Sequence, residues 1–264
     1  MGLEPSVFMS QVRSRRPLVH HITNYVTVND CANMCLCAGG SPVMTDDIDD
    51  VADMVAVSDA LVLNMGTLSR RTVGSMHAAG RVAKSVGVPV VFDPVGAGAT
   101  PFRRMVAESL IADVRPDVIK GNHGEMGILS GIGGGVRGVD SEGASGDVSE
   151  VVRTIARRWG CVAVSTGEVD YVSDGESVAV LSNGHPFESA VTGTGCMLSS
   201  VVGAYVGACG MSLGSVASAV TVFNVAAEEA AAVSGGPGTF RQVFLDSVYN
   251  IDGPTVDRMA RCSL

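Results

Sequence analysis

The chain carries few charged residues, and positive ones are scarcer than negative ones. Only 17% of its 264 residues are charged, against about 25% in an average globular protein. Lysine and arginine number 18 and aspartate and glutamate 27, so the net charge is −9. No basic cluster exceeds Arg13-Ser14-Arg15-Arg16. We therefore expect no nucleic-acid partner, and a chain this poor in charge predicts a large buried core.

Metal-binding cysteine patterns are also missing. Cys31, Cys35 and Cys37 lie close together, but the seven cysteines form no Cys-x-x-Cys pair and no second ligand cluster follows. A zinc site is therefore not expected. No secretory hydrophobic region opens the chain, so we expect reduced thiols and a cytoplasmic location.

The common nucleotide-binding motifs are absent. No P-loop of the form G-x-x-x-x-G-K-[ST] occurs. A G-x-G-x-x-G pattern does occur, at Gly133, Gly135 and Gly138. It lies in a Gly- and Ser-rich loop over 131–147 that follows a helix, so it is not a dinucleotide fingerprint. If the chain handles ATP, it does so by another arrangement.

One long uncharged stretch raises the possibility of a membrane span. Residues 189–227 contain no charge and include Gly203-x-x-x-Gly207, a pattern that packs transmembrane helices. Glycines and serines interrupt the stretch, however, and two buried helices joined near Gly210 explain it better. We therefore expect no membrane partner.

Short apolar runs alternate with helical patterns through most of the chain, which predicts a parallel sheet covered on both faces. We expect an α/β fold in a single domain, 1–264. The expected strands are 41–44, 60–64, 88–93, 117–120 and 161–165, with a hairpin over 169–182. The expected helices are 6–15 with Ser6 as N-cap, one starting at the acidic run 46–50, and 29–38, 70–86, 103–112, 123–130, 149–159, 196–209, 213–233, 240–249 and 254–262.

Polar residues follow these strands where a parallel sheet places its ligand crevice, beyond the carboxyl ends. Asn64, Asp93, Asn122 and Thr166 each come at or just after a strand end. Asp93 and Glu125 provide two carboxylates, which suits Mg²⁺ held mainly through water. Each carboxylate alone could equally be a helix cap or a surface charge.

The stretch Gly193-Thr194-Gly195-Cys196 runs directly into an apolar helix. Free N–H groups in the first turn of that helix, with the helix dipole, form a site for an anion such as phosphate. A thiol at the same turn should have a depressed pKa, so Cys196 could act as a base. The alternative is an ordinary Gly-rich turn with Cys196 as a small buried apolar residue.

Six blocks together, in order, resemble the hydroxyethylthiazole kinase family. They read P-L-V-H-H-I-T-N-Y-V, S-P-V-M, D-A-L-V-L-N-M-G-T-L-S, P-V-V-F-D-P-V-G-A-G-A-T-P-F-R, K-G-N-H-G-E and V-T-G-T-G-C-M-L-S-S-V-V-G-A, and G-G-P-G-T-F follows near Gly236. The resemblance implies a ribokinase-like fold. It also implies ATP- and Mg²⁺-dependent phosphorylation of the primary alcohol of 4-methyl-5-(2-hydroxyethyl)thiazole, in thiamine biosynthesis or salvage.

The resemblance also implies a role for each matching residue. Cys196 would accept or orient the hydroxyl proton, where related sugar and pyrimidine kinases carry aspartate. The other implied residues are Met44 and Gly193 for the thiazole, Lys120 and Thr166 for ATP, and Asp93 and Glu125 for Mg²⁺. The family is a homotrimer with active sites at subunit interfaces.

The sequence departs from the family at two of these blocks. Lys120 stands where the family often has arginine, which keeps the charge and loses the bidentate fork. His21 replaces the asparagine common after the first histidine.

Two other readings remain open. The first is another ribokinase-like enzyme, of the phosphomethylpyrimidine kinase or nicotinamide-nucleotide-repair dehydratase type. Cys196 and the S-P-V-M block count against it. The second is a non-catalytic thiazole- or thiamine-binding sensor. The presence of Asp93, Glu125 and Cys196 argues against it, because a sensor would not need these catalytic residues.

Overall fold

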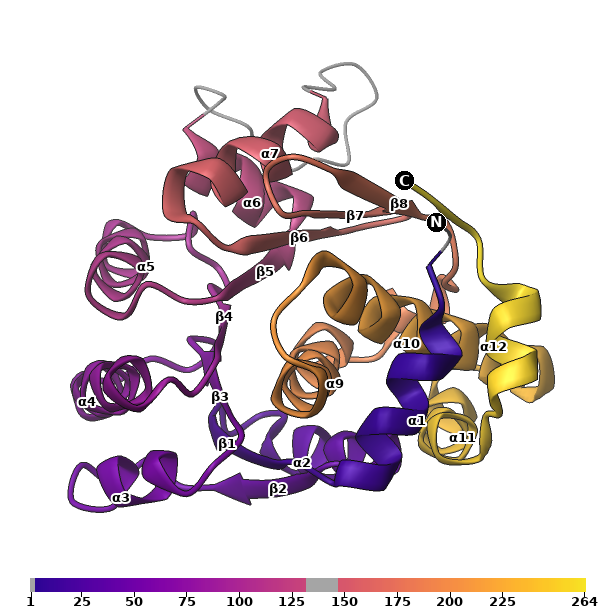
Figure 1. The fold of residues 1–264 in the computed structure, drawn as a ribbon, viewed down its shortest axis with the longest axis horizontal. Helices are drawn as coiled ribbons and strands as arrows, with labels where there is room; N and C mark the ends of the chain where they lie inside the picture. Colours follow the sequence, from indigo (N-terminus) through magenta and orange to yellow (C-terminus); the bar gives the residue numbers. More distant parts are fainter. Residues whose placement is uncertain (1–2, 132–146) are drawn as a thin grey trace.

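The computed structural model describes residues 3–131 and 147–264, and these form one nine-stranded sheet with helices on both faces (Figure 1). The strand order is β2-β1-β3-β4-β5-β6-β7-β8-β9. Neighbouring strands are parallel from β2 through β6 and antiparallel from there to β9. The strands are β1 (Leu18–Ile22), β2 (Ser41–Met44), β3 (Ala60–Asn64), β4 (Val90–Asp93), β5 (Val118–Asn122), β6 (Val162–Thr166), β7 (Asp170–Ser173), β8 (Val178–Leu181) and β9 (Cys262–Ser263). The expected mostly parallel α/β sheet is therefore confirmed.

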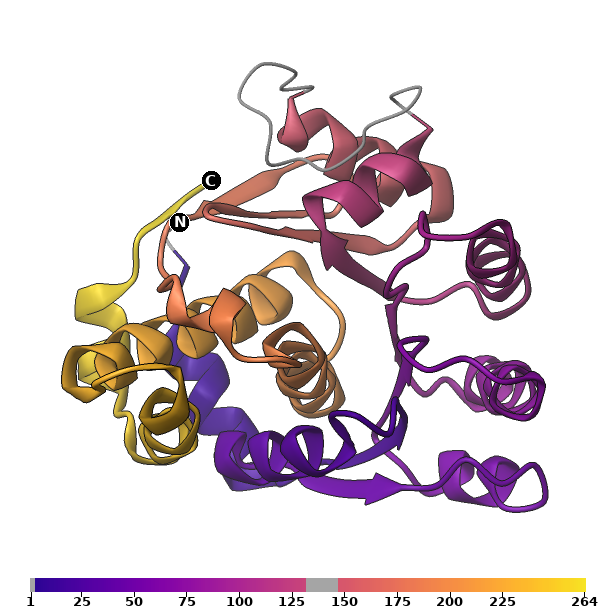
Figure 2. The same ribbon diagram turned by 180° about the vertical axis from the view of Figure 1, so that it is seen from behind.

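The helices form two layers, one on each face of the sheet (Figures 1 and 2). One face is covered by α3 (Val51–Ala56), α4 (Arg70–Val86), α5 (Pro101–Val114), α6 (His123–Ser130) and α7 (Val148–Trp159). The other is covered by α1 (Pro5–Arg15), α2 (Val28–Ala38), α9 (Thr194–Cys209), α10 (Leu213–Val233), α11 (Pro237–Asn250) and α12 (Gly253–Met259). A short helix, α8 (Phe187–Ala190), precedes α9.

Each face of the sheet carries its own apolar core, because alternate residues of a strand point to opposite faces. On β3, Leu61 and Leu63 pack toward α4 and α5, while Val62 packs toward α9. All five residues of β3 are buried. A strand buried on both faces reads as an unbroken apolar run, and this is why the parallel strands could be recognised from sequence.

The two glycines of the Gly-x-x-x-Gly pattern bring α9 close to the sheet. A Cβ on Gly203 would lie 2.7 Å from Val62 Cγ2, and one on Gly207 would lie 3.2 Å from the Asp59 carbonyl oxygen. The pattern therefore serves contact between a helix and a sheet. The expected pair of buried helices joined near Gly210 is confirmed, because α9 ends at Cys209 and α10 begins at Leu213.

Among the described helices, α10 is the one long and apolar enough to cross a membrane by length and composition. Within its most apolar window, 72% of the residues are buried inside the protein. The helix is therefore a core element, packed against α9 and α11.

Several helices begin at side chains that accept a hydrogen bond from the first turn, as N-caps do. Ser69 caps α4, Thr100 caps α5 and Ser212 caps α10. The expectation that Ser6 caps the first helix is wrong. Helix α1 begins at Pro5 without a side-chain cap, and the Ser6 hydroxyl instead donates to Asp257 Oδ2 at 2.6 Å.

Three further expectations need correction. The helix expected over 254–262 ends at Met259, and Cys262–Ser263 form a strand that pairs with β8. The acidic run 46–50 precedes α3, which begins at Val51. Helix α8 was not expected. The Gly- and Ser-rich loop and its G-x-G-x-x-G pattern lie almost wholly outside the described residues.

Candidate active site

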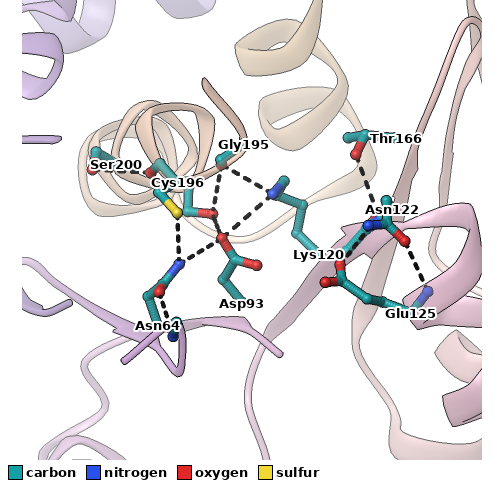
Figure 3. Close-up of polar contacts among 12 residues, drawn as sticks. Asn64, Asp93, Lys120, Asn122, Glu125, Thr166, Gly195, Cys196 and Ser200 are labelled. Atoms are coloured by element: carbon teal, nitrogen blue, oxygen red, sulfur yellow. Dashed lines mark hydrogen bonds and ion pairs between the residues drawn. The ribbon is translucent and has the colours of Figure 1, made fainter. Parts of the chain in front are cut away.

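The polar strand ends lie side by side because their strands are neighbours in register. Asn64 of β3 pairs with Asp93 of β4, and Asn122 of β5 pairs with Thr166 of β6. Since β3 to β6 are adjacent and parallel, their carboxyl ends meet along one edge of the sheet. The sequence-predicted crevice residues are therefore brought together (Figure 3).

Asp93 is the buried centre of this edge. Its side chain is 2% exposed, and its Oδ2 accepts hydrogen bonds from Asn64 Nδ2 at 2.8 Å and Ser199 Oγ at 2.7 Å. Lys120 Nζ lies 3.4 Å from the same oxygen. Three donors on one oxygen fix the carboxylate and leave its Oδ1 available for a cation or water.

Lys120 joins Asp93 to the turn before α9. Its Nζ donates to the carbonyl oxygen of Gly195 at 3.0 Å, and its side chain is 4% exposed. Burial opposes the charge, but Asp93, aided by Cys196 and Glu125, raises the pKa of Lys120 above its ordinary value. The ammonium group therefore stays charged directly beneath the Gly193–Cys196 turn.

Glu125 completes the capping box of α6, whose N-cap is Asn122, and it lies within electrostatic reach of Asp93. Its Oε2 accepts from the Asn122 backbone N–H at 2.9 Å, and its Oε1 from the Gly96 N–H at 2.7 Å. Burial and then the negative charge of Asp93 raise the pKa of Glu125. The capping contact expected as one alternative for this carboxylate is therefore present, and the Mg²⁺ role stays a prediction.

The pair of carboxylates fits a hard divalent cation. Asp93 and Glu125 repel each other, and a cation between them would relieve that repulsion. Among residues 3–131 and 147–264, no group of three or more histidine, cysteine, aspartate or glutamate side chains could hold a metal ion. Two carboxylates, with water completing the coordination, would suit Mg²⁺.

The turn at Gly193 has a left-handed backbone with φ of +88°. A Cβ there would lie 2.3 Å from Thr27 Cγ2, so both backbone and space favour glycine. No side chain caps α9, which leaves N–H groups of its first turn directed at the crevice. With the positive end of the helix dipole, they can receive a phosphate oxygen.

Cys196 lies at this turn, but its pKa is not depressed as expected. Burial and then the charge of Asp93 raise the pKa of the thiol, and Lys120, Thr27 and Asn64 oppose that rise. The helix terminus favours a thiolate, but removal from water costs the charged form more. The thiol is therefore a weak base whose contribution depends on its position.

A cavity of about 690 Å³ opens at the carboxyl ends of β1, β2 and β3. Met44 lines it, with His21, Tyr25, Arg103 and several hydroxyl-bearing residues. Gly193 and Cys196 do not line it. Gly66 lines the cavity and packs against Asn24, whose amide contacts the Cys196 thiol. Of the two predicted substrate contacts, Met44 therefore lines this cavity and Gly193 does not.

Thr166 lies at the end of β6, on the far side of Asp93 from this cavity (Figure 3). Its hydroxyl donates to the Gly121 carbonyl oxygen at 3.4 Å. The neighbouring Gly167 faces His123, whose Nε2 would lie 2.2 Å from a Cβ at position 167. Along the sheet edge, Met44 of β2 and Thr166 of β6 therefore lie on opposite sides of Asp93 of β4.

Sequence reasoning missed three residues of this site. Asn24 donates to Cys196 Sγ, and Ser199 to Asp93. The guanidinium of Arg103 donates to the Met65, Gly66 and Val95 carbonyls, which ties together the loops after β3 and β4. Asn24 and Arg103 both stood within the family blocks, and that was the one signal available for them.

The chain has a ribokinase-like fold. It superimposes on a ribokinase-like superfamily protein of Enterococcus faecalis with a TM-score of 0.66 at 12% identity, covering 93% of this chain and 90% of that one. At that identity the likeness concerns the fold alone.

The chain belongs to the hydroxyethylthiazole kinase family, whose model matches residues 9–253. It is 48% identical over 255 residues to the hydroxyethylthiazole kinase of Methanocella arvoryzae, covering 97% of this chain and 95% of that one. The structure of a hydroxyethylthiazole kinase from Pyrococcus horikoshii matches with a TM-score of 0.91 at 37% identity, covering 98% of both chains. The chain is therefore a kinase, as the sequence resemblance predicted.

Proposed function

We propose that this protein transfers a phosphoryl group from ATP to the primary alcohol of 4-methyl-5-(2-hydroxyethyl)thiazole, in thiamine biosynthesis or salvage. Family membership supports the reaction. One observation from the site carries the proposal further. A buried Asp93–Lys120 pair lies beneath the uncapped start of α9, between the Met44 cavity and the Thr166 strand end.

In this proposal the Met44 cavity holds the thiazole ring, and the loop at Gly193 borders its hydroxyethyl arm. Methionine suits a flat, sulfur-containing aromatic ring. The nucleotide lies along the ends of β5 and β6, with Thr166 beside it and the charge of Lys120 below the transferring group. Acceptor and donor would then approach the start of α9 from opposite sides, so that the attacking and leaving oxygens can lie in line with the transferring phosphorus.

Asp93 and Glu125 would hold Mg²⁺, mainly through water. When bound, that cation would neutralise charge on the nucleotide phosphates. The first-turn N–H groups of α9 would hold the oxygens of the transferring phosphoryl group. Cys196 Sγ would orient the substrate hydroxyl and, in its thiolate form, take up its proton. Because the pKa of this thiol is raised, we expect positioning and charge neutralisation to lower the barrier more than its basicity does.

An ADP-release assay with hydroxyethylthiazole, ATP and Mg²⁺, with mass detection of the product, tests the proposal. The mass of the thiazole monophosphate would support it. Saturable thiazole binding without product would favour the sensor interpretation. Product from a hydroxymethylpyrimidine alone would favour the pyrimidine kinase interpretation.

We also propose a homotrimer of this single-domain chain, in the cytoplasm. Tyr25 and Val26, beside the Met44 cavity, are 79% and 55% exposed, and apolar side chains next to a binding site are typical of an interface. The seven unpaired cysteines support a reducing compartment. Light scattering during gel filtration should give three times the 27.0 kDa chain mass. A monomer mass would contradict the trimer.

A further inference from the structure

Two buried amides surround the sulfur of Cys196. Asn24 Nδ2 lies 3.3 Å from Cys196 Sγ, and Asn64 Nδ2 lies 3.2 Å from it. Asn24 is 4% exposed and Asn64 is 2% exposed. An amide NH₂ group can only donate, so the sulfur accepts from both side chains.

The orientation of each amide follows from backbone groups that can only donate. The Gly66 N–H lies 2.9 Å from Asn64 Oδ1, and the Thr27 N–H lies 3.1 Å from Asn24 Oδ1. Each oxygen must therefore face its backbone donor, which turns each Nδ2 toward the thiol.

The two amides are also bonded to each other and to Asp93. Asn24 Nδ2 donates to Asn64 Oδ1 at 3.0 Å, and Asn64 Nδ2 donates to Asp93 Oδ2 at 2.8 Å. The chain Asn24–Asn64–Asp93 thus connects the thiol to a carboxylate of the phosphoryl-transfer site. A fully bonded buried network of this kind holds its members in one geometry.

The two donors act on the thiol in a defined direction. A hydrogen bond donated to a sulfur favours the charged form of the group. The bond from Asn64 opposes the effects of burial and of Asp93 on the pKa of Cys196, and we expect the bond from Asn24 to act in the same direction. The two bonds also fix the position of the sulfur, and a group that accepts a hydrogen bond from a substrate hydroxyl needs a fixed position.

We propose that Asn24 and Asn64 are positioning residues for the phosphoryl transfer, because their amides hold the Cys196 sulfur as a hydrogen-bond acceptor and link it to Asp93. This inference rests on the proposed role of Cys196. Its test therefore includes a measurement that needs no turnover.

The first variant is Asn24→Asp, which keeps the side-chain shape and the oxygen that accepts from the Thr27 N–H. It replaces the donor facing the sulfur by an oxygen. The second variant is Asn24→Ser, which keeps an acceptor for Thr27 and removes the amide without adding charge. Asn33→Asp is the matched control, because Asn33 Nδ2 donates to Asn29 Oδ1 along α2.

Alkylation of Cys196 by iodoacetamide, followed by mass spectrometry of its peptide over a range of pH, reports the thiol directly. Loss of the donor should move the pH at which the thiolate forms upward, by about one unit for Asn24→Ser and more for Asn24→Asp. Asn33→Asp should match the wild type. An unchanged alkylation profile in Asn24→Ser would overturn the proposal, even if Asn24→Asp shifted through its charge.

Kinetics supply the second measurement. We expect kcat to fall about tenfold in Asn24→Ser, with the KM for hydroxyethylthiazole changed less than about threefold. In a Cys196→Ala background the same substitution should cause little further loss, because Asn24 acts through the thiol. An equal loss in both backgrounds would overturn the proposal. If the wild type had no kinase activity but the alkylation shift appeared, the arrangement around the thiol would stand and the proposed function would fail.

Discussion

Replacing Gly193 by alanine should destabilise the fold and the anion-binding turn together. The new methyl group would lie 2.3 Å from Thr27 Cγ2, on a backbone with φ of +88°. The left-handed backbone costs about 1–2 kcal/mol for a residue with a Cβ, and overpacking costs about 1–3 kcal/mol. The unfolding free energy should therefore fall by about 2–5 kcal/mol, which still leaves a folded protein at 25 °C if its stability is ordinary.

Urea unfolding measures this loss, and a compensating substitution separates its two parts. Thr27→Ser removes the Cγ2 that the new methyl group meets and keeps the hydroxyl that accepts from Cys31 Sγ. The double variant should recover the overpacking part, about 1–2 kcal/mol, and retain the backbone part. The kcat of Gly193→Ala should fall by about tenfold or more, because the N–H groups that receive the phosphoryl oxygens are displaced.

Gly74→Ala is the matched control for the same chemical change. Gly74 lies within α4, and a Cβ there meets nothing within 4 Å. This variant should be about 0.5–1 kcal/mol more stable than the wild type. The reasoning is refuted if Gly193→Ala unfolds within about 0.5 kcal/mol of the wild type, or if Thr27→Ser gives no recovery.

Three further variants test other parts of the structure. Gly203→Ala should lower the free energy of unfolding by about 1–3 kcal/mol in urea, because its Cβ would lie 2.7 Å from Val62 Cγ2; unchanged stability would contradict the packing of α9. Glu125→Gln should raise the Mg²⁺ concentration needed for half-maximal rate while the KM for the thiazole stays constant; an unchanged Mg²⁺ titration would remove Glu125 from the metal's environment. Burial raises the pKa of Glu188 from 4.5 to about 8. Between these two pH values the native protein keeps a proton that the unfolded chain has lost. The stability of the protein therefore falls as the pH rises from 4.5 to 8, by at most about 5 kcal/mol. In Glu188→Gln, the free energy of unfolding in urea should differ less between pH 5 and pH 8.5 than it does in the wild type. The same difference in both proteins would contradict this prediction.

The local sequence pattern predicted the parallel half of the sheet well and the antiparallel edge less well. Strands β3 to β6 are continuous apolar runs followed by polar residues, so each carries its own signal. Strand β9 has no such signal. It forms because Val180 of β8 pairs with Ser263, a contact between distant segments that a helical pattern over 254–262 does not record.

The same distinction applies to the site. Asp93 and Asn64 could be placed from sequence because each follows a strand, and parallel strands bring their ends together. The donor from Asn24 to Cys196 spans 172 positions, and the one from Ser199 to Asp93 spans 106. For the thiol, the local rule that a helix start lowers its pKa was outweighed by burial, which depends on the whole fold.

Lys120 supplies positive charge to a buried edge that carries several acidic groups. Asp93, Glu125 and Cys196 all lie within electrostatic reach of its ammonium group, and two unpaired carboxylates here would favour protonation over metal binding. Because Lys120 Nζ also donates to the Gly195 carbonyl, the cation that pairs with Asp93 also fixes the turn that would receive the phosphoryl group. Loss of this amine would leave a buried charge uncompensated, at a cost of about 3–5 kcal/mol, and would release that turn. A cation at this position is therefore required by the buried pair even before any nucleotide contact is considered.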